Sequence, residues 1–577
     1  MTTAFNVNSA ALDNASYERI WTQRRVGVAL SVLLALAVCW HLDGVQLSLA
    51  FQPATFEALW SVLRGLFPPD LSPGFLKTVL HGLVTTVATA IAGTIISVLV
   101  ALPLGALATP ILWRRGILSA AANRNLIRPL ESFASRAILA LLGFLRAVPD
   151  LVWGLLFVTA VGLGSLAGAL ALAVAYTGVL GRVYADAFAN VDPQPLEALQ
   201  ATGATRAQIL LRGIWPQALP NLTAYTLYSF ECCVRAASVL GFVGAGGIGY
   251  EISISMRLFE YGQVMTLILA FVILLALTDI VSKRVRASMR PNAGSIRRPP
   301  GIKRGRFVWH TSGYVIAGVA IVGSFYVAGF SLEHFGEANT VKNMLRFCRG
   351  MMTPDFAKEF VLSLGPLAMQ TLAISVLGTL MGMAIGGILA IPATSTLVLM
   401  HSESPGNRSQ IKRGLRWSVF WAARLVLNLL RSIPDLIWVL VCILVVGIGP
   451  FAGTLAIGLH TAGVLGKLYA ETMEEVPAQP VEALRALGAG RLQLLAWALW
   501  PQAKRMLASY SVLRWETNIR ASAILGLLGG GGLGQAIYNN VQLGFYSRLA
   551  TLLLLVYLLV MVSDWIGDKV SSRSLGA

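Results

Sequence analysis

The chain has 577 residues, of which 56% are hydrophobic and only 12% are charged. Soluble domains carry about 25% charged residues, so this composition excludes a soluble enzyme or binding module and predicts an integral membrane protein. The formal net charge of +18 would suit a nucleic-acid partner, but the basic residues gather in loops between apolar segments, and we expect no nucleic-acid binding.

Apolar segments long enough to cross a bilayer follow one another along the chain. They are expected near residues 24–42, 79–109, 134–163, 165–188, 219–243 and 262–282, and again near 308–330, 364–394, 418–448, 450–472, 504–528 and 546–567. We therefore predict an all-α integral membrane protein with about twelve transmembrane helices, arranged as two six-helix halves.

The second half of the chain repeats the first. VDPQPLEALQATGA begins at Val191 and VPAQPVEALRALGA at Val476, an offset of 476 − 191 = 285 residues. The other motifs described below recur at the same offset, so two homologous units are fused head to tail and are expected to face each other about a pseudo-two-fold axis. We divide the chain into a first half at 1–282, a linker at 283–306 and a second half at 307–577.

Basic residues set the expected orientation in the membrane. The linker is rich in lysine and arginine and contains no acid. By the positive-inside rule, the linker and both termini are cytoplasmic. The segments 43–75 and 331–361 mix acids with bases and suit the outer side.

Span three of each half carries the pattern Arg-x-x-Pro-Asp-Leu-x-Trp. Arg146 and Asp150 stand four residues apart, as do Arg431 and Asp435, and on a helix such residues share one face and can form a local ion pair. Charges inside a span are costly unless they pair or face a polar cavity. The sequence leaves open whether these residues are a packing ion pair beside a proline kink or part of a transport pathway.

The loop between spans four and five is amphipathic in both halves. It occupies residues 191–218 and 476–503. Prolines precede it and Trp-Pro-Gln stands near its end, so it is expected to form two short helices hinged at Gly203 or Gly488. The acids Glu197 and Glu482 are expected in the first helical turn, where the helix dipole favours a carboxylate.

Span five ends in a second charged pair and a glycine run. The pairs are Glu231 with Arg235 and Glu516 with Arg520. The glycines are Gly241, Gly244, Gly246, Gly247 and Gly249, repeated as Gly526, Gly529, Gly531, Gly532 and Gly534. No strand precedes the run, which excludes a dinucleotide fingerprint. We predict a re-entrant gate loop near the outer side, with exposed backbone N–H donors where a small anion passes.

No catalytic residue, metal site or cofactor site is predicted in this chain. The segment Gly463 to Lys467 lacks the spacing of a phosphate-binding loop and is followed by Leu468. The five cysteines show no metal-ligand spacing.

The loop at 191–218 resembles the EAA loop of binding-protein-dependent ABC importer permeases. The resemblance rests on Glu197 and Ala198 with Gly203, and on Glu482 and Ala483 with Gly488, each glycine being followed by proline thirteen residues later. In that family the loop is the coupling helix that docks on the ATPase. The chain departs from the motif at its third residue, where it has leucine, and at the residue before the proline, where it has tryptophan.

Taken with the span-three motif, HTAGVLGKLYAE at 460–471 and the glycine run, the chain resembles phosphonate-type permeases. The resemblance implies a type-I-like importer fold in a bacterial inner membrane, two copies of an ATPase subunit that hold ATP and Mg²⁺, and a periplasmic or lipid-anchored binding protein. The implied substrate is phosphonate, phosphite or hypophosphite. Another anion, an organophosphate, or an ion-coupled secondary transporter stays as an alternative.

We assign the intramembrane charges to the substrate pathway because arginine suits an oxyanion. The set is Arg146, Asp150, Glu231, Arg235, Arg431, Asp435, Glu516 and Arg520. Within it, Arg235 and Arg520 are expected to favour the anion, since they precede the glycine run.

Overall fold

The computed structural model describes residues 37–41, 43, 52–109, 124–289, 318–330, 338–398 and 407–575. Within these ranges every regular element is a helix. The predicted first span of each half and most of the linker lie partly or wholly outside the described residues. The last helix of the first half continues to Met289, so it enters the segment that we assigned to the linker.

The two halves contain matching sets of helices. The first half has α3 (Pro53–Gly65), α4 (Pro73–Ala108), α6 (Arg124–Ala147), α7 (Asp150–Val161), α8 (Ser165–Ala189), α9 (Pro193–Ala201), α10 (Arg206–Gln208), η2 (Ile209–Ile214), α11 (Trp215–Gly241), α12 (Ile248–Arg257) and α13 (Tyr261–Met289). The second half has α16 (Ala338–Met352), α17 (Lys358–Ala393), α18 (Ser395–Val398), α19 (Asn407–Ser432), α20 (Asp435–Val446), α21 (Pro450–Glu474), α22 (Ala478–Ala486), α23 (Arg491–Leu494), η3 (Leu495–Leu499), α24 (Trp500–Leu525), η4 (Gly526–Leu528), α25 (Gly532–Gln542) and α26 (Tyr546–Leu575).

Fewer helices qualify as membrane spans than the sequence predicts. In the described residues, 6 helices are long and apolar enough to cross a bilayer, or up to 9 if each of 3 bent pairs counts as one span. α11 is not among them, although its counterpart α24 belongs to a bent pair. Charged residues such as Glu231 and Arg235 lower the hydropathy of α11, which explains the difference.

Small residues allow the central helices of each half to pack closely. α4 packs against α8, and α17 packs against α21. A Cβ at Gly93 would lie 2.7 Å from Leu172, and one at Gly378 would lie 2.7 Å from Ile457. Glycine at these positions lets the backbones approach, as is typical of packing in membranes. Each half therefore has its own rigid pair of long helices.

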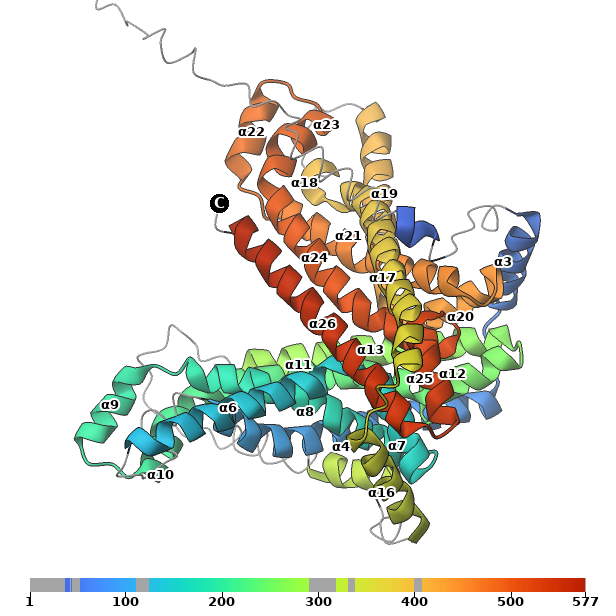
Figure 1. The fold of residues 1–577 in the computed structure, drawn as a ribbon. Helices are drawn as coiled ribbons and strands as arrows, with labels where there is room; N and C mark the ends of the chain where they lie inside the picture. The colour runs from blue at the N-terminus through green and yellow to red at the C-terminus, as the bar shows by residue number, and fades with distance from the viewer. Residues whose placement is uncertain are drawn as a thin grey trace, which may run out of the picture.

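The two halves exchange their short central helices. α7 packs on α16 and α25 of the second half, and α20 packs on α3 of the first half. Ile437 of α20 belongs to one apolar cluster with Ile248, Ile252 and Phe271 of the first half. The reciprocal exchange is the pseudo-two-fold arrangement that the repeat predicts. From this junction two arms diverge, with α9 and α10 at the end of one and α22 and α23 at the end of the other (Figure 1).

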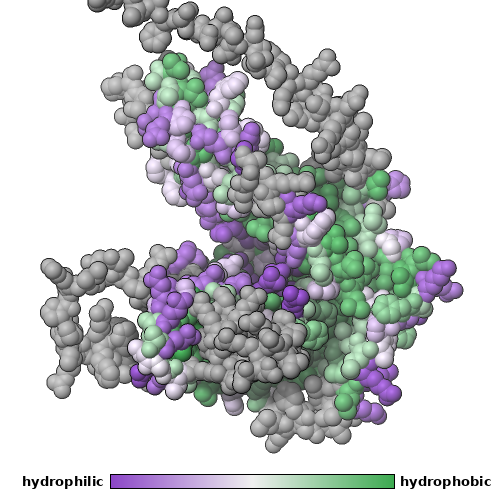
Figure 2. Space-filling view, turned by 60° about the vertical axis from the view of Figure 1, so that its left-hand side comes forward, coloured by the Kyte–Doolittle hydropathy of each residue, from purple (hydrophilic) through white to green (hydrophobic). Residues whose placement is uncertain are grey.

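Figure 2 shows a recess between the two arms, and hydrophilic residues lie on its walls. Hydrophobic residues cover much of the surface on the other side of the junction in the same view. A polar recess beside an apolar outer surface is what a transport path through lipid requires.

Candidate functional site: charged bends and coupling loops

The span-three motif builds a sharp bend rather than one straight helix. The segment up to Ala147 and α7 meet at 87°. Pro149 stands at the N-cap of α7, and Asp150 begins that helix, where the helix dipole favours a carboxylate. The indole Nε1 of Trp153 donates to the carbonyl of Leu145 over 3.4 Å. This bond satisfies a backbone carbonyl that the end of α6 leaves without a helical partner.

The second half repeats the bend. α19 and α20 meet at 96°, and Trp438 donates to the carbonyl of Leu430 over 3.2 Å. The predicted local pairs of Arg146 with Asp150 and of Arg431 with Asp435 are therefore wrong, because each arginine ends one helix and each aspartate begins the next.

Glycines of α8 and α21 support these bends from behind. A Cβ at Gly178 would lie 2.6 Å from the backbone N of Arg146, and one at Gly463 would lie 2.5 Å from that of Arg431. Only glycine leaves room for such close backbone approach. The glycine of the HTAGVLGK segment thus positions the arginine of span three.

The partner of Arg146 comes from the other half. Its guanidinium lies 3.2 Å from a carboxylate oxygen of Asp564 on α26, and both side chains are about one third exposed, at 35% and 29%. The equivalent acid of the first half is Asp279 on α13, since 564 − 279 = 285. Asp279 instead pairs with Lys283 at 2.7 Å, while it and Glu471 interact electrostatically with Arg431.

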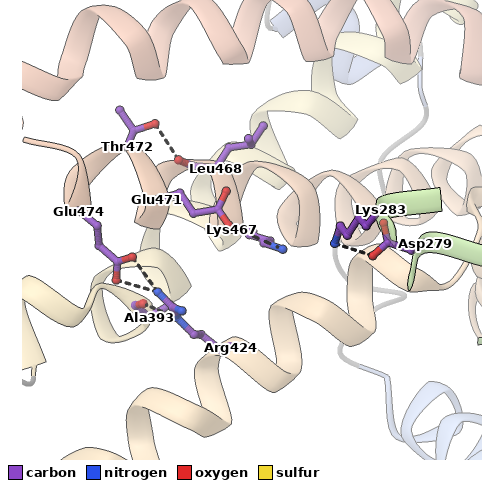
Figure 3. A network of polar contacts seen from close by, with 9 residues as sticks. All are labelled: Asp279, Lys283, Ala393, Arg424, Lys467, Leu468, Glu471, Thr472 and Glu474. Carbon is purple, nitrogen blue, oxygen red and sulfur yellow. Dashed lines mark hydrogen bonds and ion pairs between the residues drawn. The ribbon is translucent and has the colours of Figure 1, made fainter. Parts of the chain in front are cut away.

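Sequence reasoning missed Asp279 and Asp564. The signal was present, because both halves carry an aspartate at the same position of an otherwise apolar last span. Figure 3 shows Asp279 and Lys283 of α13 opposite Lys467 and Glu471 of α21. The ion pair of Lys467 with Glu471 is longer, at 3.7 Å.

The span-five arginines reach the bend of the opposite half. Arg520 lies 3.8 Å from Glu516, which is the local pair that the sequence predicts, and it also interacts electrostatically with Asp150 of the first half. Arg235 is exposed and interacts electrostatically with Arg431 of the second half. In the described residues, no ion pair of Arg235 with Glu231 is found, although Glu231 is itself buried.

Two second-half residues explain this difference. His460 Nδ1 lies 3.2 Å from Asp435 and 3.0 Å from the carbonyl oxygen of Ile433. Arg514 also interacts electrostatically with Asp435. At the equivalent positions the first half has Ala175 and Ser229. We did not single out His460 and Arg514, although polar residues in one repeat opposite small ones in the other were a readable signal.

The glycine run forms a packed turn. Gly244, Gly246 and Gly247 have φ of 99°, 74° and 76°, and Gly529, Gly531 and Gly532 of the second half have φ of 101°, 76° and 69°. Glycine adopts this left-handed conformation at no steric cost. Gly241 and Gly249 contact each other's backbone, as do Gly526 and Gly534. All ten glycines are buried or half-buried.

The expectation of exposed N–H donors in this run is wrong for the amides whose partners are known. The amide of Ala245 donates to Leu240, and that of Ile248 donates to Thr86 Oγ1 of α4 over 2.9 Å. In the second half, the amide of Leu533 donates to Thr371 Oγ1 over 2.9 Å. These bonds hold the turn against the long helix of its own half.

The coupling loops have the predicted helix–turn–helix form. Gly203 and Gly488 have φ of 75° and 80° and no atom lies within 4 Å of an added Cβ, so they are turn residues rather than sites of close contact. Glu197 and Ala198, and likewise Glu482 and Ala483, are exposed.

The acids do not stand where the sequence predicts. α9 begins at Pro193 and α22 at Ala478, and neither has an acid in its first turn. Glu197 and Glu482 lie in the second turn, so the helix dipole adds little. The single buried residues of the two helices, Leu196 and Val481, attach them to the helices that follow.

A π-helix stands before each Trp-Pro, at η2 and η3, and sequence reasoning missed it. Pro216 and Pro501 lack an N–H and clash with a normally placed helical carbonyl, and a widened turn accommodates both defects. Gly213 lies inside η2, where an added Cβ would meet Leu196 and Leu199 at 2.6 Å and 3.1 Å. The leucine that departs from the motif therefore packs the coupling helix onto η2.

Two like units, polar bends at their junction and exposed loops at the ends of both arms define a transporter subunit with two docking ends. The chain belongs to the family described as the binding-protein-dependent transport system inner membrane component, which matches residues 115–291 and 411–575. It is a membrane-spanning ABC importer permease and not an enzyme, since ATP hydrolysis belongs to a separate subunit. The predicted family and all-helical class are confirmed.

Known proteins with similar sequences are transport permeases. The phosphate-import permease protein PhnE of Mycolicibacterium smegmatis is 30% identical over 92% of both chains. The putative phosphite transport system permease protein HtxC of Stutzerimonas stutzeri is 33% identical over 48% of this chain and 92% of its own. A chain of the MetNI methionine ABC transporter in inward-facing form aligns with 38% of this chain and 100% of its own, at 24% identity and a TM-score of 0.33.

Proposed function

We propose that this permease imports a small phosphorus oxyanion, of the phosphonate, phosphite or hypophosphite type, by alternating access between the two halves. The observation that carries the proposal is the similarity over 92% of the chain to a phosphate-import permease that has the same extent. Arginines at the junction of the halves support it, because a guanidinium donates paired hydrogen bonds to an oxyanion. Inorganic phosphate itself is the second candidate, since it is the substrate in that relative's name.

The same proposal covers the partners. Each exposed coupling loop docks one ATPase subunit, so that two copies serve one chain, and ATP and Mg²⁺ bind there. A periplasmic or lipid-anchored binding protein delivers the anion from the outer side. Both termini and the linker lie in the cytoplasm of a cell whose inner membrane holds the chain, as the positive-inside rule requires.

Transport by a reconstituted complex tests this. The chain, its ATPase and its binding protein are placed in proteoliposomes, and uptake of labelled phosphate, phosphite and methylphosphonate is measured with and without ATP. We expect ATP-dependent uptake of at least one of these anions, unaffected by ionophores. Uptake that continues without ATP and collapses with the ion gradient would establish a secondary transporter instead. A nucleotide-binding assay on the purified chain alone is expected to show no saturable binding.

A further inference from the structure

We propose that the bend between α19 and α20 is an anion-binding station on the transport path, formed by Arg235 of the first half and Arg431 of the second. Its ligand is a tetrahedral phosphorus oxyanion. The inference rests on the proposed function and adds to it the place where the anion contacts the permease.

The bend between α6 and α7 has its arginines neutralised. Arg146 is paired with Asp564 at 3.2 Å, and Arg520 with Glu516 at 3.8 Å. Arg520 also interacts with Asp150, which has Ala175 rather than a histidine beside it in the repeat. Two arginines thus face three acids there, and an anion would meet net negative charge.

The bend between α19 and α20 is different because its aspartate is already engaged. Asp435 interacts with His460 at 3.2 Å and with Arg514. Arg235 therefore finds no free acid at this bend and instead interacts with Arg431. Among the described residues, neither arginine has a carboxylate within 4.0 Å.

The charges at the two bends differ in sign. The cations at the second bend are Arg235, Arg431, Arg514 and Lys283, and the acids are Glu231, Asp435 and Asp279. The sum is 4 − 3 = +1 before any charge on His460, against 2 − 3 = −1 at the first bend. The nearby pair of Lys467 with Glu471 adds nothing to either sum.

Both arginines can be reached by a solute. The side chains of Arg235 and Arg431 are exposed, although each stands deep in its half, next to a buried residue (Ala236) or to the bend itself. They come from opposite halves at the junction from which the two arms diverge (Figure 1). Two uncompensated guanidinium groups facing each other repel, and a doubly charged oxyanion between them removes that repulsion while accepting their N–H groups.

The placement also couples binding to movement. Because one arginine belongs to each half, an anion that bridges them holds the halves together at this bend. When the halves separate, the anion keeps at most one of its two cationic partners and is released. A site made by two arginines of the same half would not respond in this way.

Uptake by reconstituted variants tests the station. Arg235→Gln and Arg431→Gln are each expected to reduce ATP-driven uptake about tenfold, as loss of one partner of a desolvated charge pair does. The double variant should lose less than the product of the two single losses, because both residues act on one anion. Arg182→Gln, which removes an exposed arginine of α8, is the control for net charge and should stay within about twofold.

A second measurement keeps the test independent of turnover. Equilibrium dialysis of the permease–ATPase complex with labelled inorganic phosphate, without binding protein, should show a saturable component that the double variant loses and Arg182→Gln keeps. Variants that bind the ATPase normally, transport at the native rate and retain phosphate binding would overturn the station. A native complex that carries no phosphorus anion would overturn the proposed function instead, and dependence of another anion on Arg235 and Arg431 would keep the station.

Discussion

The cytoplasmic ends of the two halves are alike, whereas the two central bends differ in charge. α9 and α22 have the same length and the same offset, their glycine turns have φ of 75° and 80°, and each is followed by a π-helix. The bends share their geometry, at 87° and 96°. Their charge networks do not match, because His460 and Arg514 have small residues as counterparts.

This difference separates what a repeat keeps from what it changes. The cytoplasmic ends face two like partners in the proposed complex, so each half needs the same surface. A single substrate path runs between the halves, and an asymmetric pair of bends suffices for it. Symmetric loss after equivalent changes at the loops, and unequal loss at the bends, would sharpen this comparison.

The largest expected effect falls on the glycine turns, where the halves agree. A Cβ at Gly249 would collide with the carbonyl of Ser238, and one at Gly534 with that of Ala523. Gly249→Ala and Gly534→Ala should each destabilise the protein by about 3 kcal/mol or more, because backbone must move to relieve the clash. Thermal unfolding in detergent measures it. Gly143→Ala, with no atom within 4 Å, is the control and should be neutral or stabilising. Equal melting temperatures for all three variants would contradict the packed turn.

The coupling loops come next. Glu197→Ala and Glu482→Ala should each weaken ATPase docking by about 1–2 kcal/mol, as charged groups at an interface do, and to the same extent. The double variant should show lower uptake and less co-purified ATPase with an unchanged melting temperature. Gly203→Val and Gly488→Val should act more strongly, because valine is strained at φ of 75° and 80°. Normal association and uptake in the double-glutamate variant would show that docking uses another surface.

Much of the fold could be predicted because repeats and hydropathy are written in the chain itself. The offset of 285 residues predicted the matching halves, and proline with glycine predicted the kink at span three and the turn in the coupling loop. The packing partners could not be predicted in this way. Arg146 and Asp150 are four residues apart, but a bend of 87° places them on different helices, and the ion pair of Arg146 lies 418 residues away at Asp564.

Positions of functional groups within an element were also beyond the sequence. Glu197 was expected in the first turn of its helix because Pro193 and Pro195 could both begin a helix, and the choice of Pro193 moves the acid to the second turn. The π-helices depend on how a proline is accommodated by its neighbours, which composition does not show. In the same way, charge at a bend depends on residues of three or four helices at once.

The cross-half ion pair offers an unequal test of the two bends. Asp564→Asn removes the partner of Arg146, and we expect it to destabilise the protein by about 1–2 kcal/mol, between the values for exposed and buried pairs. Asp279→Asn removes a more exposed pair with Lys283, where Asp279 is 45% exposed, and should cost less than about 0.5 kcal/mol. Thermal unfolding of both variants decides this. Equal costs would mean that the two bends are symmetric in solution.

The smallest effect is expected at a buried polar cluster of the second half. Asn518 is fully buried and donates through Nδ2 to Thr379 Oγ1 over 2.8 Å and to Thr461 Oγ1 over 3.0 Å. The first half has Cys233 at the equivalent position, also fully buried. Asn518→Cys gives the second half the residue of the first, and the loss of these hydrogen bonds should destabilise the protein by about 1 kcal/mol.

The matched control makes the opposite exchange at the neighbouring position. Cys232 is half-buried, and its counterpart is Thr517, whose hydroxyl bonds only to its own helix at Leu513. Cys232→Thr should therefore change the melting temperature little, by less than about 0.5 kcal/mol in free energy of unfolding. If Asn518→Cys were equally silent, the asparagine would not be holding α24 against α17 and α21. The polar asymmetry of the halves would then matter for the charged bends alone.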